Sequence, residues 1–332
     1  MKGRIVAAFA VVYLVWGSTY LGIRWAIETI PPLLLTASRF LAAGLLLYAW
    51  ALARGAPRPE RRTWLPSLII GALLVTGGNG LVVWSEQRVP SGLAALIVAG
   101  MPLWVALFER TFPGGKPLAA GRVAGLLVGF AGLAFLLTGQ RGATGVCVGS
   151  SACAAGQSAI PLIYLLAVPL ASVSWALGSV LSRRMPLPGD KVLASAMSML
   201  GGGAVALVLS LADGELKGFD PVTVSAGSLA AWAYLVVFGS MLAFTCFTWL
   251  VSVVDPTRVA TYAYVNPVVA LLLGAWLAHE PVGPRILLAT PVILLGLALV
   301  LRSPPAPAQS QMPQPAPRPS TETACPSADP VT

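Results

Sequence analysis

The densest group of polar and aromatic side chains in any apolar stretch of this chain is Tyr262, Tyr264 and Asn266, followed at once by Pro267. Hydroxyl and amide groups inside an apolar stretch need partners that lipid cannot supply. A proline within a helix also leaves the carbonyl four residues earlier without its usual donor. Such groups are suited to holding a small solute, and we expect this segment to contact a substrate.

Similar side chains occur in other apolar stretches: Trp16, Tyr20, Asn79 and Trp175. Trp16 and Trp175 lie past the middle of their stretches, so an aromatic belt at the membrane interface explains them less well. Asn79 belongs to a run that reads Thr-Gly-Gly-Asn-Gly, which favours either tight helix packing or the lining of a cavity. We expect these residues to converge on one cavity near the membrane midplane.

Arg39 is the one basic residue well inside a predicted span. A buried charge is costly there and usually pairs with an acid or faces water. Glu28, Glu86 and Glu280 are the acidic candidates, of which Glu86 and Glu280 are the predicted charge partners. Arg39 is therefore either an anion-binding or gating residue, or half of a structural ion pair with a snorkelling side chain.

Two prolines, Pro102 and Pro267, interrupt predicted spans near their middles, at nearly matching places in the two halves of the chain. A helix that lacks a backbone hydrogen bond bends there at lower cost. We predict that both prolines are hinges and that replacing either with alanine stiffens its span.

The sequence gives little support for catalysis or for metal binding. The chain has a single histidine and no H-E-x-x-H or G-x-S-x-G motif, so we expect no enzyme, no metal site and no cofactor. Cys147 and Cys153 lie in a Gly/Ala/Ser-rich outer loop, where they form either a disulfide or two free thiols.

The composition, 57% hydrophobic and 10% charged residues, predicts an integral membrane protein. A spanning helix needs about 20 apolar residues. The chain offers ten such stretches, roughly 5–23, 33–53, 65–84, 91–110, 119–138, 162–182, 192–212, 227–251, 258–279 and 284–301. The expected fold is therefore an all-α, ten-helix membrane bundle.

The distribution of the 21 Lys and Arg residues predicts the orientation. With a cytoplasmic N-terminus, 15 lie in inner segments and 5 in outer ones, with Arg39 inside a span, so both termini are expected in the cytoplasm. The basic residues then set topology, and we expect no nucleic-acid partner. The expected partners are a small-molecule substrate and the lipid bilayer.

The sequence repeats itself. Trp16–Arg24 and Trp175–Arg183 are similar segments 159 residues apart, each opening a hydrophobic half of five expected spans. Two copies with an odd number of crossings must lie upside down relative to each other, as in many secondary transporters. We expect a first repeat at 1–138, an outer loop at 139–161, a second repeat at 162–301 and a disordered Pro-rich cytoplasmic tail at 302–332.

Glycines recur at small-xxx-small spacing from Gly121 to Gly132. This spacing predicts close helix contact, either within the bundle or across a homodimer.

Several of these segments together resemble the EamA-type permeases of the drug/metabolite transporter superfamily, with a likeness to their YedA/PecM-like bacterial members. They are WGSTYLGIR, ASRF, GNGLVVWSEQRVPSGLAALIVAGMP and TYAYVNPVVALLLGAWLAHE. The resemblance covers about residues 5–301 and implies ten helices in two inverted repeats around a central cavity. It also implies efflux of small metabolites, amino acids or drugs across the bacterial inner membrane. A membrane scaffold or receptor, or a scramblase-like protein, remains the alternative.

Overall fold

The computed structural model describes residues 2–112, 120–138, 147–148, 159–254, 259, 262–279 and 282–302. Residues 303–332 of the predicted tail, Glu280 and Cys153 lie outside these residues, as does most of the predicted outer loop. Of that loop, the structure describes a pair of two-residue parallel strands, β1 (Cys147–Val148) and β2 (Ala159–Ile160).

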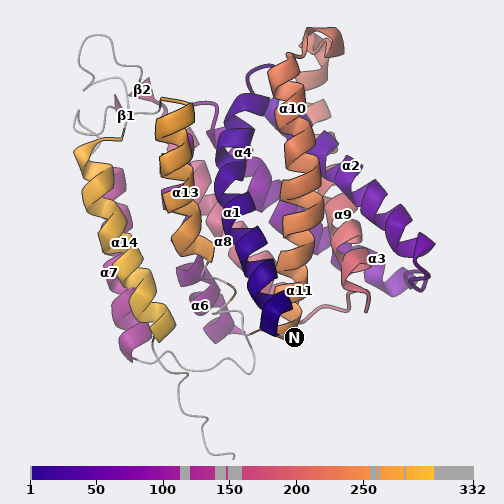
Figure 1. Cartoon of the computed structure of the whole chain (residues 1–332), viewed down its shortest axis with the longest axis horizontal. Helices are drawn as coiled ribbons and strands as arrows, with labels where there is room; N and C mark the ends of the chain where they lie inside the picture. The colour runs from indigo at the N-terminus through magenta and orange to yellow at the C-terminus, as the bar shows by residue number, and fades with distance from the viewer. Residues whose placement is uncertain are drawn as a thin grey trace, which may run out of the picture.

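The first half of the chain folds into helices (Figure 1). These are α1 (Lys2–Ala26), α2 (Pro32–Ala53), α3 (Arg61–Gly71), the π-helix η1 (Ala72–Gly80), α4 (Leu81–Ser85), α5 (Ser91–Val98), α6 (Met101–Thr111) and α7 (Ala120–Thr138). Proline precedes the first turn of α2 and of α5, where its missing N–H would have had no helical partner anyway.

The second half repeats this order. Its helices are α8 (Leu162–Leu181), α9 (Lys191–Asp213), the short 3₁₀ turns η2 (Glu215–Gly218) and η3 (Pro221–Thr223), α10 (Ala226–Tyr234), the π-helix η4 (Leu235–Phe244), α11 (Thr245–Val253), α13 (Tyr262–Leu277) and α14 (Pro284–Arg302). The Asp190 side chain caps α9 by accepting from the Leu193 N–H, and Gly214 ends it in a left-handed conformation with φ of 80°.

Seven helical stretches of the described chain are long and apolar enough to cross a membrane. They are Lys2–Ala26, Pro32–Ala53, Arg61–Ser85, Ser91–Thr111, Leu162–Leu181, Lys191–Asp213 and Ala226–Val253. The apolar helices Val265–Leu277 and Ile286–Gly296 are shorter. The chain is thus a multi-pass helical bundle.

The two π-helical segments occupy corresponding places in the two halves. η1 interrupts the third stretch of the first half, and η4 interrupts the third stretch of the second half. A π-helix widens the hydrogen-bonded turn, is rare, and is found mostly at functional sites.

Packing between the halves is reciprocal. α1 packs against α10, η4 and α13 of the second half, and α8 correspondingly packs against η1 and α4 to α6 of the first. α2 packs along α9, and α7 packs along α14. Exchanging the two halves therefore exchanges the contacts of α1 with those of α8, and it leaves the α2–α9 and α7–α14 pairs unchanged.

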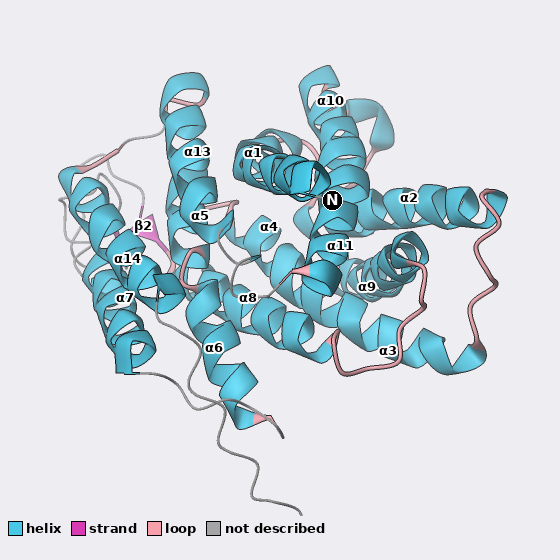
Figure 2. Ribbon diagram, turned by 60° about the horizontal axis from the view of Figure 1, so that its bottom comes forward, coloured by secondary structure: helices cyan, strands magenta, loops and turns pink. Residues whose placement is uncertain are grey.

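The helices α7 and α14 lie side by side at one edge of the bundle, away from α2 and α3 (Figures 1 and 2). A side chain added at Gly132 would meet the Ile293 side chain at 2.9 Å, and Gly296 lies against the Gly125–Gly129 backbone. The glycines of α7 therefore make a helix contact within the bundle, which is one of the two kinds of contact that their spacing predicts.

Candidate functional site

A buried pocket lies between the two halves. It is lined by described residues of α1, α2, η1, α4, α5, α6, α8, η4 and α13, and its cavity volume is about 70 Å³. A cavity of this size holds a few water molecules and is smaller than a typical ligand pocket of ~300–1,000 Å³. The structure thus shows a nearly closed pocket.

The structure brings together six of the seven residues that the sequence marked for substrate contact. Trp16, Tyr20, Asn79, Trp175, Tyr262 and Asn266 all line this pocket. The seventh, Tyr264, lies in α13, and its side chain is outside the described part of the structure.

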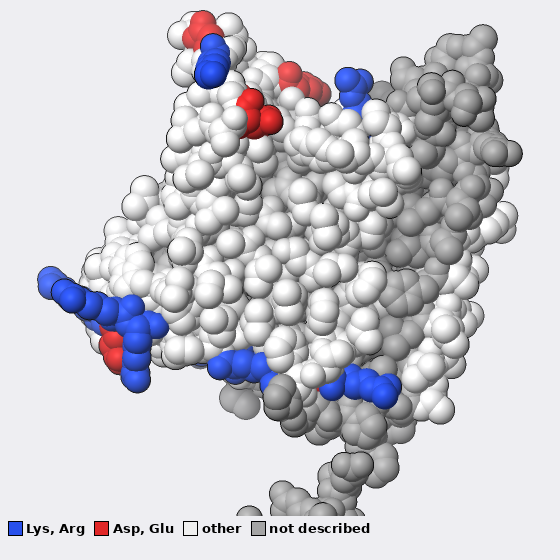
Figure 3. Space-filling view, turned by 180° about the vertical axis from the view of Figure 1, so that it is seen from behind, with Lys and Arg blue, Asp and Glu red and all other residues white. Residues whose placement is uncertain are grey.

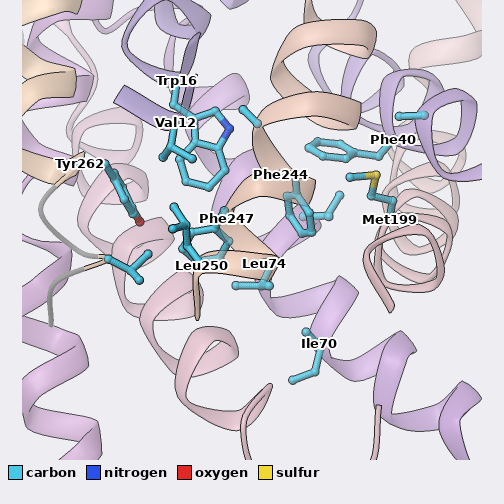
Figure 4. Close-up of a cluster of buried hydrophobic side chains, with 14 of the residues drawn as sticks. Val12, Trp16, Phe40, Ile70, Leu74, Met199, Phe244, Phe247, Leu250 and Tyr262 are labelled. Carbon is cyan, nitrogen blue, oxygen red and sulfur yellow. The ribbon is translucent and has the colours of Figure 1, made fainter. Parts of the chain in front are cut away.

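Aromatic rings form one wall of the pocket. The Trp16 ring packs edge-to-face on Trp175, with 5.4 Å between centroids, and on Tyr262 at 5.1 Å. Phe247 lies 5.0 Å from Trp16, and Figure 4 shows Trp16, Tyr262 and Phe247 facing one another. Each such pair adds ~0.5–1.5 kcal/mol beyond area burial, so the wall is held in a defined geometry.

Arg39 of α2 lies between the two π-helical segments. Its side chain is only 2% exposed, and its Nε donates to Ser240 Oγ of η4 at 2.8 Å. Its Nη1 donates to Asn79 Oδ1 of η1 at 3.4 Å, and its guanidinium lies 4.7 Å from the Phe40 ring centroid. Within the described chain, Arg39 is the one charged residue that lines the pocket.

The backbone of η4 also shapes the pocket. Trp16 Nε1 donates to the Gly239 carbonyl at 3.2 Å, which fixes the orientation of the indole. A Cβ added at Gly239 would lie 2.8 Å from Arg39 Nη2, so only glycine leaves room for the guanidinium.

The Thr-Gly-Gly-Asn-Gly run both packs and lines the pocket. Thr76 Oγ1 donates to the Gly202 carbonyl at 2.7 Å, and a Cβ at Gly78 would meet the Trp175 ring at 2.7 Å. Asn79 lines the pocket itself. The sequence left these two interpretations open, and the geometry supports both.

Of the two predicted charge partners of Arg39, Glu280 lies outside the described residues, and Glu86 acts on Arg39 electrostatically without a described salt bridge. Glu86 is fully buried, does not line the pocket, and accepts from Arg24 Nη1 through its backbone carbonyl at 3.2 Å. Arg39 forms none of the described salt bridges, for which the N···O distance is at most 4.0 Å. Arg39 is instead held by neutral hydrogen-bond acceptors.

The two prolines differ in their local structure. Pro267 lies inside α13 and is buried, as the sequence predicted. Pro102 lies in the first turn of α6, because the expected span breaks after α5 at Ala99 and Gly100. The missing N–H of Pro102 therefore falls where a helix leaves its N–H groups free.

A second cavity of about 30 Å³ adjoins the first and shares Met101 and Tyr262 with it. It extends to Glu109 and Arg183, whose side chains form a salt bridge at 3.6 Å. The Tyr262 hydroxyl lies 4.0 Å from Met101 Sδ. These two side chains therefore separate the pocket from the end of the bundle that carries Arg183.

Charged side chains concentrate at the two ends of the bundle. On the face shown in Figure 3, Lys and Arg predominate along one end, with an acidic side chain among them, whereas acidic and basic side chains are mixed at the other. No group of three or more metal-binding side chains is present among the described residues.

Sequence reasoning missed several pocket residues, notably Thr19, Phe40, Ser172 and Gly239. It also missed Ser240, which accepts a hydrogen bond from Arg39. Only Gly239-Ser240 carried a signal, as a small polar pair within the apolar run LVVFGSMLAF. That signal marks a close approach of helices, but it does not say which side chain fills the space.

Comparison with known proteins identifies the family. The EamA-like transporter family matches residues 3–138 and 162–302, once in each half. The inner membrane transporter YedA of Escherichia coli K12 is 38% identical over 297 residues, covering 89% of this chain and 90% of YedA. The transporter YvbV of Bacillus subtilis is 27% identical over 300 residues, covering 90% and 92%.

The crystal structure of another protein shares this fold. It has a TM-score of 0.62 and 23% sequence identity, covering 90% of this chain and 96% of the other. With the family match in both halves, the chain belongs to the EamA-like transporter family of membrane proteins.

Proposed function

We propose that this protein is a secondary transporter that exports a small organic solute across the bacterial inner membrane by alternating access. The observation that carries the proposal is the pocket between the two halves, which gathers Arg39, two asparagines and an aromatic wall. Transporters built from two repeats bind their substrates at the interface between them.

The reciprocal packing of the two halves supports an inverted repeat with ten crossings. In this arrangement α7, α13 and α14 also cross the membrane. Their apolar sequences are compatible with that, although α13 has only 16 residues as described. An inverted pair has two equivalent conformations, one open to each side.

The inner-membrane location of this proposal is supported by the similarity to YedA, an inner membrane transporter, and by the positive-inside distribution of Lys and Arg. Both termini then lie in the cytoplasm. The second cavity, which ends at Arg183, would face the same side. Export would begin with solute entering there and passing Met101 and Tyr262.

The proposal is tested with cells that overexpress the protein and are challenged with a panel of toxic amino-acid analogues, organic acids and drugs. A compound to which the cells become resistant is then measured by counterflow in proteoliposomes. Tyr262→Ala opens the pocket wall. This variant should lose most of the resistance and most of the counterflow. Trp276→Ala removes a 75% exposed aromatic of the same helix and serves as the matched control.

Resistance and counterflow that persist in Tyr262→Ala would contradict this pocket as the transport site. Lipid flipping by the reconstituted protein without solute counterflow would favour the scramblase alternative.

A further inference from the structure

The chemistry of the pocket also indicates a class of substrate, an inference that rests on the proposed transport function. Arg39 is a buried cation whose described hydrogen-bond and ring partners are all neutral, and the charge of buried Glu86 acts on it without a described salt bridge. Burying an arginine at membrane depth without a counter-ion costs several kcal/mol, roughly 2.5–3.5 on insertion scales. A site that retains such a charge gains when an anion enters it.

The guanidinium has donors left for such an anion. Of its five N–H groups, Nε and one on Nη1 make the described hydrogen bonds, and the latter is long, at 3.4 Å. Nη2 donates no described hydrogen bond. The guanidinium fork matches a carboxylate, which can accept two parallel N–H bonds.

The rest of the pocket selects against a cation. No Asp or Glu lines it among the described residues. Tyr20, Asn79 and Asn266 offer neutral polar groups, and the amide of Asn266, oriented with its nitrogen toward Tyr13 O and Tyr262 O, already donates at 3.1 and 3.2 Å. A cationic ligand would meet Arg39 with no acid in the described lining of the pocket to accept its charge.

The aromatic wall determines what kind of body the ligand carries at the end away from its carboxylate. Trp16, Trp175, Phe244 and Tyr262 present ring faces and edges to the cavity. A flat apolar or aromatic body stacks on such surfaces. The cavity volume of about 70 Å³ is below the ~150 Å³ that holds a benzene ring, so the pocket must widen to admit such a body, and the body must be small.

We propose that the substrates are small organic carboxylates with a flat, apolar body, bound through their carboxylate to Arg39 between the two π-helical segments. Neutral and cationic compounds of the same shape are discriminated against. Asn79 and Ser240 hold the guanidinium in place and leave its outer edge for the ligand.

The test uses three isosteric probes, benzoate, benzamide and benzamidinium, with the detergent-purified full chain at neutral pH. Their rings are the same and only the charge of the head group changes. Hydrogen bonds to charged groups contribute ~1.5–3 kcal/mol, so benzoate should bind at least about tenfold more tightly than benzamide, and benzamidinium most weakly. Calorimetric titration measures all three.

Two variants locate the effect. Arg39→Gln should abolish the preference for benzoate over benzamide. Because that variant could fail to fold, Asn79→Asp provides a second test, since a carboxylate at this position occupies the guanidinium and should lower benzoate affinity at least about tenfold. Arg88→Gln removes an exposed arginine outside the pocket and is the charge-matched control.

Equal affinity for benzoate and benzamide in the parent protein, or a benzoate preference that survives Asn79→Asp, would overturn the assignment. Transport and binding then separate the two proposals. Counterflow of neutral or cationic compounds alone refutes the carboxylate class and leaves the transporter intact. Selective benzoate binding with no counterflow of any carboxylate supports the site and refutes transport.

Discussion

At the scale of single residues, the pocket depends on a buried charge that forms no described salt bridge and shares its pocket with no acid among the described residues. Arg39 is oriented by Ser240 Oγ and Asn79 Oδ1, and the absence of a side chain at Gly239 makes space for it. Neutral acceptors fix the direction of a guanidinium without cancelling its charge. The same residue in a salt bridge would be a structural tie, and the described contacts show no such tie.

Gly239→Ala tests this arrangement without reference to any substrate. The new methyl group would lie 2.8 Å from Arg39 Nη2 and 3.0 Å from the Thr19 methyl, so one of these groups must move. Overpacking of this kind costs ~1–3 kcal/mol, and we expect a lower melting temperature and weaker benzoate binding. Differential scanning fluorimetry and calorimetric titration measure the two effects.

Gly227→Ala is the matched control, because a Cβ there meets only Ser225 Oγ at 3.8 Å. It should change neither quantity. If Gly239→Ala were as harmless as the control, the guanidinium would not be confined as described.

The sequence predicted part of this site, and there is a physical reason why it marked some residues and missed others. Trp16, Asn79 and Trp175 were recognisable because polar or aromatic groups deep in an apolar span need an explanation. Ser240 was not, because a lone serine in a helix usually bonds to its own backbone. Which acceptor reaches Arg39, 201 residues away in sequence, is decided by tertiary packing.

At the scale of helices, the sequence predicted the apolar stretches but not their irregularities. It treated Pro102 and Pro267 as equivalent interruptions, whereas the structure ends α5 before Pro102 and runs α13 through Pro267. The two π-helical segments had no signal of their own, since a π-turn uses the same residues as an α-turn. The glycines of η1 predicted close packing correctly but not its geometry.

The difference between the prolines gives a prediction. Pro267→Ala restores an N–H that can bond to the Ala263 carbonyl, which stiffens α13. We expect normal insertion and unchanged or higher thermal stability, with transport slowed at least severalfold. Pro102→Ala adds an N–H in the first turn of α6, where it has no helical partner, and should transport at the rate of the parent.

Transport rates in proteoliposomes, normalised to folded protein, decide this prediction. Equal slowing in both variants would restore the equivalence that the sequence suggested. Parent rates in both would make the prolines structural kinks rather than hinges.

At the scale of the whole molecule, orientation is the property on which the direction of transport depends. The distribution of Lys and Arg predicts that residues 54–63 and 183–191 face the cytoplasm and that 139–161 faces outward. Single cysteines at Arg58 and Gly189 should then react with an impermeant thiol reagent only in inside-out vesicles. A cysteine at the exposed Lys217 should react only in intact spheroplasts. Labelling of Arg58→Cys from outside would reverse the topology.

The central claim is that the pocket between the two halves opens alternately to the two sides of the membrane. The most direct measurement places one cysteine at Ser172, a 2% exposed residue that lines the pocket, after the four native cysteines have been replaced by serine. An impermeant thiol reagent is applied from each side in turn. Leu288→Cys, on a 62% exposed side chain of α14, is the lipid-facing control.

We predict that Ser172→Cys reacts from both sides, in spheroplasts and in inside-out vesicles, while Leu288→Cys reacts from neither. Proteoliposomes of the same variant should retain a small encapsulated dye, as a transporter requires and an open channel does not allow. Reaction from one side only, from neither side, or together with dye leakage would contradict alternating access through this pocket.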